Sequence, residues 1–188
     1  MKTSSRSPAV IAVAESVSEI TNLPRVSGFD PEFAQTIDGS TLSALLALTK
    51  TNMQEIYNSA GVEEWAWRDE GKRNQLASSK MRFLIARGAE QHISAFMAFK
   101  FLLENGIPVI YVYELQVRPE HAGKGLGSHL VDAAMHVCKT KAPGIKRLVL
   151  TCFRHNTGAL SFYKKLGFKE EPHSPSDKCY CILGKQFG

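Results

Sequence analysis

The residues with the clearest chemical potential are three glycines that alternate with other residues in the stretch Gly123-Lys-Gly125-Leu-Gly127. They follow a run of strand-forming residues at 109–117 and precede apolar residues at helical spacing from Leu126 onward. Glycines let the backbone approach a ligand closely, and the first turn of a helix offers N–H groups that lack acceptors within the helix. A strand, a glycine turn and a helix start therefore predict a phosphate-binding site.

Two well-known glycine-rich motifs do not match this stretch. A Rossmann fingerprint has the strand close before the first of three glycines and an acidic residue near the end of the next strand, and neither feature is present. A P-loop requires Ser or Thr after its Gly-Lys pair, whereas Gly125 follows Lys124 here. A plain glycine turn that joins a strand to a helix is the remaining alternative at this point.

Glu114 is the only carboxylate in the apolar strand run 109–117. A carboxylate in such a position can accept a proton in catalysis. It can also be a structural acid that pairs with a lysine or an arginine. The residue type and its position leave both interpretations open.

The elements that must position these residues follow from periodicity and from chain breakers. Apolar residues at helical spacing predict helices at 8–20, 40–59, 68–78, 126–141 and 155–165. Strand-forming runs predict strands at 81–87, 93–103, 109–117, 147–153, 168–171 and 178–183. Ser40 or Thr41 is the expected cap of the second helix, and Asn105-Gly106 predicts a tight hairpin. Residues 22–38 read as a connection with a short strand near 25–27.

Composition limits the class of protein. The 188 residues, with 44% hydrophobic and 22% charged side chains, suit one soluble globular domain. No apolar run approaches the roughly 20 residues that cross a bilayer, so we expect no membrane partner and a location in the cytoplasm and nucleus. The four cysteines lack metal-ligand spacing, so we expect reduced thiols and no metal. The net charge of +5 comes from scattered residues, which does not favour direct nucleic-acid binding.

The stretch from 111 to 130 resembles the coenzyme A turn of the GNAT acetyltransferases, and the order of the expected elements is similar to that of the same family. The resemblance implies an α+β fold with a mixed, mostly antiparallel central sheet flanked by helices, in which strands 109–117 and 147–153 run parallel and splay apart. It implies a GNAT acetyltransferase domain over 25–188 after an N-terminal helical extension over 1–24. Acetyl-CoA is the implied co-substrate. The family's usual Arg or Gln three residues before Gly125 is Ala122 here.

Several stretches are similar to one branch of that family, the NatD-type N-terminal acetyltransferases. That branch acts on the N-terminal serine of histone H4-type tails that begin Ser-Gly-Arg-Gly, and the resemblance implies the same reaction here, by direct attack on acetyl-CoA. The similarity extends over about 25–183. The stretches that carry it are Leu48-Thr-Lys-Thr-Asn-Met-Gln54, Tyr57, Glu64-Trp-Ala-Trp67, Lys72-Arg73, Tyr111-Val-Tyr-Glu-Leu-Gln-Val117, Gly125-Leu-Gly127 and Leu150-Thr-Cys-Phe-Arg-His-Asn-Thr-Gly-Ala159.

The resemblance also implies roles for residues. A thioester is attacked by a neutral amine, and an α-amino group, with a pKa of about 8 against about 10.4 for lysine, is the easier nucleophile. The catalytic candidates are Glu114 as the base, Tyr113, and the backbone N–H of Leu115. The co-substrate is expected at Leu115, Gln116, Val117, Gly123, Lys124, Gly125, Leu126, Gly127, Ser128 and Asn156. The acceptor peptide is expected at Tyr57, Trp65, Glu104, Tyr111, Tyr113, Thr151 and Tyr180.

Some assignments stay open at this stage. Leu102 stands where the family has an aspartate, which leaves Glu104 as the acid that can take its place. Tyr163 either protonates the departing thiolate or packs in the core. The alternative functions are a GNAT enzyme that acts on lysine side chains or a small amine, and a non-catalytic module that binds acetyl-CoA. A histone tail is the expected partner, and contact with the ribosome during synthesis is an open alternative.

Overall fold

The computed structural model describes residues 6–20, 23–24, 29–88 and 91–188. In this part of the chain the strands are β1 (Asp30–Ala34), β2 (Arg82–Arg87), β3 (Ile93–Glu104), β4 (Ile107–Val117), β5 (Arg147–Phe153), β6 (Lys169–Glu170) and β7 (Tyr180–Gln186). The helices are α1 (Arg6–Glu15), α2 (Gly39–Asn58), α3 (Asp69–Leu76), α4 (Leu126–Lys141) and α5 (Thr157–Lys165), with short 3-10 turns η1 (Glu63–Trp65) and η3 (Pro119–His121). None of the described helices is both long and apolar enough to span a membrane.

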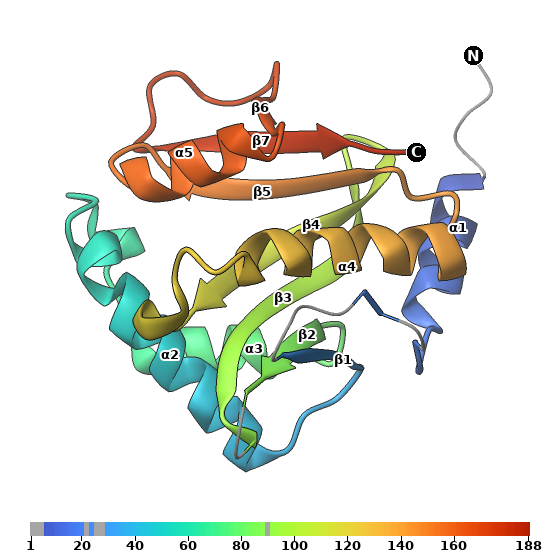
Figure 1. Cartoon of the computed structure of the whole chain (residues 1–188). Coiled ribbons are helices and arrows are strands. Elements are labelled where there is room, and N and C mark those ends of the chain that lie inside the picture. Colours follow the sequence, from blue (N-terminus) through green and yellow to red (C-terminus); the bar gives the residue numbers. More distant parts are fainter. Residues whose placement is uncertain (1–5, 21–22, 25–28, 89–90) are drawn as a thin grey trace.

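These strands form one sheet in the order β1-β2-β3-β4-β5-β7-β6 (Figure 1). β4 and β5 run parallel, and the other neighbouring strands run antiparallel. This confirms the expected α+β fold with a mostly antiparallel sheet. The parallel pair is the central strand and the strand that follows the next long helix, as the order of elements predicts.

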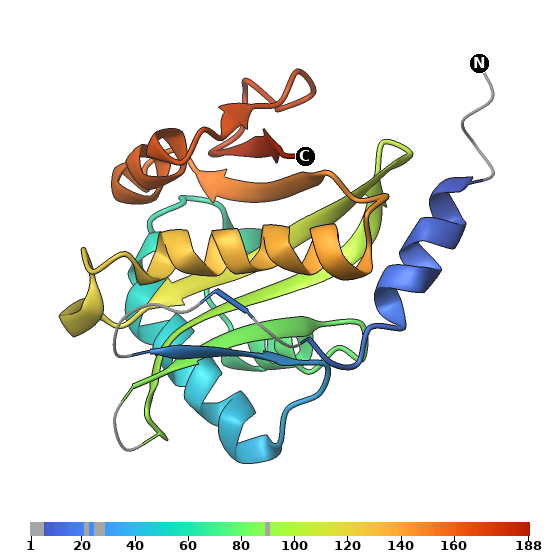
Figure 2. The ribbon, with the colours of Figure 1, turned by 45° about the vertical axis from the view of Figure 1, so that its right-hand side comes forward.

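Helices cover both faces of the sheet, and Figure 2 shows α4 in front of β3 and β4 with α2 behind them. The α4 core packs Leu130, Ala134 and their neighbours on α4 against Met97 and Ile110 of the sheet, and Ala14 of α1 and Tyr163 of α5 join it. The α2 core lies on the opposite face of the sheet. It includes residues of α2, α3, β2 and β3, among them Leu45, Leu48, Leu76, Phe83, Phe96 and Ala98. Because β3 contributes to both cores, its residues are apolar on both faces.

The hairpin between β3 and β4 is the one that the sequence predicts. Asn105 and Gly106 both have positive φ angles, 49° and 77°, as a two-residue turn of this kind requires. The pairing of the two strands then changes register, because Phe99 lies opposite Val112 whereas Ala98 lies opposite Glu114. Tyr113 is therefore the extra residue of a β-bulge in β4.

The bulge decides which face of the sheet Glu114 occupies. Side chains alternate between the faces of a strand, so in a regular strand Glu114 would point to the same side as Val112, into the α4 core. The extra residue changes the alternation, and Glu114 lies opposite Ala98, on the face covered by α2 and α3. Tyr113, which packs against the α2 core, lies on that face as well.

β4 and β5 pair over a short distance only, from Ile110 opposite Leu148 to Val112 opposite Leu150. Beyond these positions, among the described residues, β4 pairs only with β3 and β5 pairs only with β7. Arg118 N donates to Ser94 O of β3, and backbone groups alternate in direction along a strand. The N–H and C=O groups of Leu115 and Val117 therefore face the gap between β4 and β5.

Some local predictions were wrong. β1 lies in the segment that was expected to be a connection. It is an edge strand, and edge strands tolerate a proline such as Pro31. The strand expected near 25–27 lies outside the described residues. Asp38, not Ser40 or Thr41, caps α2, since its carboxylate accepts from Thr41 N at 2.6 Å. α5 begins at Thr157, because the side chain of Asn156 caps it.

Candidate active site

The gap between β4 and β5 opens into a cavity of about 740 Å³. Its walls come from β4, the glycine turn, the start of α4, β5, α5 and α2. Splaying two strands of one sheet exposes backbone groups without breaking the fold, because each strand keeps its other neighbour. The cavity wall thus combines exposed backbone groups of β4 with polar and apolar side chains of the surrounding elements.

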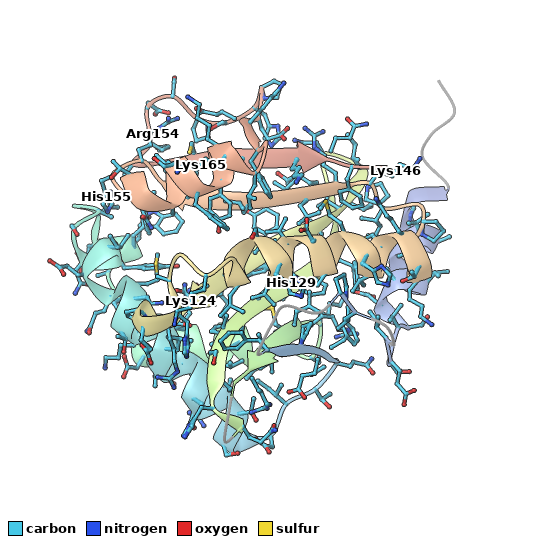
Figure 3. All side chains as sticks on the ribbon, viewed as in Figure 1. Lys124, His129, Lys146, Arg154, His155 and Lys165 are labelled. Carbon is cyan, nitrogen blue, oxygen red and sulfur yellow. The ribbon has the colours of Figure 1, made fainter. Side chains whose placement is uncertain are left out.

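The glycine turn forms one end of the cavity. Gly123 and Gly125 have φ angles of 76° and 83°, which L side chains rarely adopt. A Cβ at Gly127 would lie 3.0 Å from Cζ of Phe162 on α5, so this glycine allows α4 and α5 to approach closely. The N–H groups of the first turn of α4 have no acceptor within the helix and can bind an anion. Lys124 on the turn and Lys165 on α5 add positive charge at this end (Figure 3).

Further polar groups could hold an extended ligand between this end and the middle of the cavity. Leu115 and Val117 present their backbone to the gap, and Asn52 Nδ2 donates to Val117 O at 3.0 Å. Asn156 lines the cavity, and its Oδ1 accepts from Ala159 N at 3.2 Å. A strand edge that leads to a glycine-lined helix start fits the pantetheine arm and pyrophosphate of coenzyme A. Leu115 to Val117, the glycine turn and Asn156 would hold them.

Glu114 lies in a buried polar network. Its Oε1 accepts from Lys72 Nζ at 2.5 Å, and its Oε2 accepts from Gln116 Nε2 at 2.8 Å. Asn52 Nδ2 in turn donates to Gln116 Oε1 at 3.0 Å. The carboxylate is therefore paired with a lysine, one of the two interpretations that the sequence left open. It also lines the cavity, so pairing and a role in chemistry are compatible.

An aromatic slot lies at the other end of the cavity. Phe153 is at its centre, with the ring of Tyr57 at 5.1 Å and the ring of Trp65 at 5.4 Å, both edge to face. Tyr111 and Tyr113 continue the slot along β4, with ring centroids 5.4 Å apart. Such rings provide rigid apolar walls and hydroxyl groups that can orient a polar chain end.

Burial changes the acidity of the tyrosines in this site. Desolvation raises the pKa values of Tyr57, Tyr111, Tyr113 and Tyr163, and the carboxylate of Glu114 adds to the effect at Tyr57. The hydroxyl of Tyr111 is hydrogen-bonded to Thr151 Oγ1 at 2.5 Å, which opposes the rise of its pKa. All four hydroxyls therefore stay protonated at neutral pH. They can donate hydrogen bonds or a proton, but they are poor bases.

Most of the site residues expected from the sequence meet in this one cavity. Those that line it are Tyr57, Trp65, Tyr111, Tyr113, Glu114, Leu115, Gln116, Val117, Gly123, Gly125, Leu126, Gly127, Ser128, Thr151 and Asn156. Lys124 and Tyr180 lie outside the lining, although the ring of Tyr180 packs 5.3 Å from that of Trp65. Glu104 lines a smaller neighbouring cavity, where His173 Nε2 lies 3.2 Å from its Oε1.

Tyr163 packs in the core and also lines the cavity, so both interpretations that the sequence left open are compatible with its position. Its ring packs edge to face against Phe162 and Phe168 in the α4 core, 5.1 Å and 5.3 Å away. It also lines the cavity, close enough to Glu114 for that charge to contribute to its raised pKa.

Sequence reasoning missed several residues of the site. Lys72, Asn52 and Gln75 hold the Glu114 network, and Phe153 and Lys165 line the cavity. Lys72 alone had a possible signal, because a lysine on the buried side of a short helix requires an acidic partner. The identity of that partner depends on how α3 docks, which no local pattern reports.

The splayed parallel strands, the bulge and the glycine turn together define the fold and site of an acyl-CoA-dependent acetyltransferase. In agreement, the model of the acetyltransferase (GNAT) family matches residues 43–168, and the chain belongs to that family.

Relatives can be compared over most of this chain. This chain is 30% identical to N-alpha-acetyltransferase 40 of Saccharomyces cerevisiae over a match of 155 residues. The match covers 72% of this chain and 54% of that protein. The chain thus spans about half the length of this relative. Among solved structures, PaiA N-acetyltransferase of Thermoplasma acidophilum in complex with coenzyme A has a TM-score of 0.62 at 23% identity, over 84% of this chain and 99% of that one. NAA60 of Arabidopsis thaliana in complex with a bisubstrate analogue has a TM-score of 0.56 at 14% identity, and the match covers 85% of this chain and 99% of that one. These two likenesses concern the fold.

Proposed function

We propose that this protein transfers the acetyl group of acetyl-CoA to the N-terminal α-amino group of a polypeptide. The preferred acceptor in this proposal is the serine of a histone H4-type tail that begins Ser-Gly-Arg-Gly. The tail is then the main partner, and the protein acts in the cytoplasm and the nucleus. The sequence similarity to N-alpha-acetyltransferase 40 supports the class of reaction.

The observation that carries the proposal is the meeting of three features in one cavity. The glycine turn can hold a pyrophosphate, the open edge of β4 can pair with a pantetheine arm, and the aromatic slot lies beyond both. Glu114 lies between the arm and the slot along β4. An amine in the slot would therefore meet the thioester beside a carboxylate.

The proposed reaction is a direct transfer. The neutral α-amine attacks the thioester carbonyl, a C–N bond forms and the C–S bond breaks. The amine loses one proton to the Glu114 carboxylate, directly or through one water, and the departing thiolate takes up one proton. The N–H of Leu115 faces the gap and can stabilise the negative charge on the carbonyl oxygen. Tyr163, which stays protonated and lines the cavity, can supply the proton for the thiolate.

The slot favours a flexible chain end over a bulky acceptor. Tyr57, Trp65 and Tyr113 line the cavity, and in this proposal their rigid rings accept a small first residue such as serine. Glu104 lies past Tyr111 along the same face, near enough for its charge to contribute to the raised pKa values of Tyr111 and Tyr113. A cationic third residue would extend in that direction.

The test is an acetyl-transfer assay with acetyl-CoA and three acceptors. We expect turnover with a Ser-Gly-Arg-Gly peptide and none with the same peptide already acetylated at its N-terminus. We expect little turnover with a polyamine. Equal turnover of the free and the blocked peptide, when both contain a lysine, would identify a side-chain acetyltransferase instead. Coenzyme A binding without turnover of any acceptor would indicate a binding module.

A further inference from the structure

A lysine that the proposed reaction does not use holds the carboxylate of Glu114. Lys72 lies on α3 and is 8% exposed, and Glu114 is 4% exposed. Lys72 Nζ donates to Glu114 Oε1 at 2.5 Å, to Gln75 Oε1 at 2.8 Å and to Tyr57 OH at 3.0 Å. An ammonium group has three N–H donors and no acceptor, so these partners use all of its donors.

The other side of the carboxylate is fixed as well. Glu114 Oε2 accepts from Gln116 Nε2 at 2.8 Å, and Gln116 Oε1 accepts from Asn52 Nδ2 at 3.0 Å. Asn52 comes from α2, so a continuous chain of hydrogen bonds joins α3, β4 and α2. The carboxylate therefore cannot rotate away from the cavity without breaking at least one of these bonds.

The charge of Lys72 is the one that acts most directly on Glu114. Burial by itself lowers the pKa of Lys72, but the attraction of Glu114 and the contact with Tyr57 raise that pKa overall. The titratable groups that face Glu114 in the described chain are Lys72 from α3, Tyr57 from α2 and Tyr163 from α5. Because burial raises the pKa values of both tyrosines, Lys72 is the only one of the three that is charged at neutral pH.

Stability does not explain such a pair. Removing two charges from water costs about as much as their attraction returns, and apolar residues of similar volume often stabilise a fold equally well. A buried ion pair is better explained by what it does to the geometry and charge of its members. Here one member lines the cavity in which the proposed reaction occurs.

We propose that Lys72 is a positioning residue for acetyl transfer, an inference that rests on the proposed function. Its ammonium group places a positive charge against the Glu114 carboxylate and holds that carboxylate at the cavity wall, where it can accept the proton of the acceptor amine. Its hydrogen bond to Tyr57 joins the same group to the wall of the aromatic slot.

The first test is the pH dependence of kcat/KM for a Ser-Gly-Arg-Gly peptide in Lys72→Met, Lys72→Arg and wild type. Removing the cation disfavours an ionised carboxylate, so in Lys72→Met the acidic limb should move to higher pH by about one unit or more. kcat at neutral pH should fall about tenfold. Lys72→Arg keeps the charge, so both the position of the acidic limb and kcat at neutral pH should be close to those of wild type. Arg73→Met removes one exposed charge from the same helix and should match wild type.

The second test separates action through Glu114 from a general loss of structure. In a Glu114→Gln background, Lys72→Met should cause almost no further loss of kcat, because its effect passes through the missing carboxylate. A pH profile in Lys72→Met that keeps the wild-type acidic limb would overturn the proposal. So would independent, multiplying losses in the double variant.

A third measurement does not depend on activity. The side-chain carboxyl of Glu114 can be followed by carbon-13 NMR during a pH titration, with Glu114→Gln to assign its signal. We expect it to become protonated at higher pH in Lys72→Met than in wild type, and an unchanged titration would contradict the role of Lys72. If wild type acetylates no peptide while this titration shifts as expected, the proposed function fails and the Lys72–Glu114 coupling stands.

Discussion

Glu114 combines the environment of a structural acid with a place in the cavity wall. Glu114→Gln keeps the shape and can still accept a hydrogen bond from Lys72, but the amide cannot take a proton. We expect kcat to fall about 10²-fold or more, with little change in the affinity for acetyl-CoA. Steady-state kinetics and calorimetric titration measure the two quantities. An unchanged pH–rate profile in the variant would place the base elsewhere.

Glu104 is the residue on which peptide selectivity should depend. The protein carries a net charge of +5, so long-range attraction does not favour a cationic tail. A nearby carboxylate therefore has to bind the arginine of that tail. Losing a carboxylate partner costs a bound arginine about 1–3 kcal/mol. Glu104→Ala should therefore raise KM for a Ser-Gly-Arg-Gly peptide about tenfold and barely change it for Ser-Gly-Ala-Gly.

The control for this variant is Glu32→Ala, which removes one acid on the edge strand β1, where Glu32 pairs with Arg87 and does not line either cavity near Glu104. It should leave KM for both peptides unchanged. The assignment of Glu104 as the reader of the arginine would be wrong if Glu104→Ala raised KM equally for the two peptides.

Among the elements, the junction of β4 and α4 is where fold and binding depend on each other most. Gly125 combines a φ of +83° with a place in the cavity wall, whereas Gly106 has a similar φ of +77° and lies in the β3–β4 hairpin. Gly125→Val should weaken coenzyme A binding at least tenfold, because the side chain occupies the approach to the first turn of α4. Gly106→Val introduces comparable backbone strain and should bind normally.

Calorimetric titration with coenzyme A measures both variants, and circular dichroism shows whether each is folded. Wild-type affinity in a folded Gly125→Val would remove the pyrophosphate from this turn. A loss of the same size in Gly106→Val would show that strain, not the site, is responsible.

For the whole molecule, the burial of thiols makes the free energy of unfolding decrease as the pH rises into the alkaline range. Desolvation raises the pKa of Cys138 and of Cys152 from 9.0 to about 12. Below pH 9 the thiol is protonated in both the folded and the unfolded chain, so its contribution to the free energy of unfolding is fully present. Above pH 9 the thiol ionises only in the unfolded chain, and the free energy of unfolding falls until the thiol also ionises in the folded chain. Each thiol should lower the free energy of unfolding by about 2 kcal/mol between pH 9 and about 10.5.

Urea unfolding under a reducing agent at several pH values measures this decline. Cys138→Ala loses a buried side chain and starts from lower stability, but its decline over the same interval should be smaller by about 2 kcal/mol. The buried tyrosines contribute in the same direction at higher pH, so the difference between the two proteins isolates the thiol. Identical declines in wild type and variant would show that Cys138 does not ionise on unfolding in this range.

Local signals in the sequence determined much of this protein. The spacing of apolar residues located α2, α4, β3, β4 and β5 to within a few residues. Asn105-Gly106 and the alternating glycines marked two turns whose backbone angles only such residues adopt easily. These features depend on neighbours in the chain, which is why they can be read before any contact is known.

Only the tertiary structure decided how these pieces make a site. The bulge at Tyr113 arises from the pairing of β3 with β4, and it alone moves Glu114 from the α4 core to the opposite face. The partner of Glu114 is Lys72, 42 residues away, brought there by the docking of α3. Glu104 pairs with His173 from the far end of the chain, outside the main cavity. Register and docking depend on the sum of many distant contacts, and no single stretch of sequence encodes that sum.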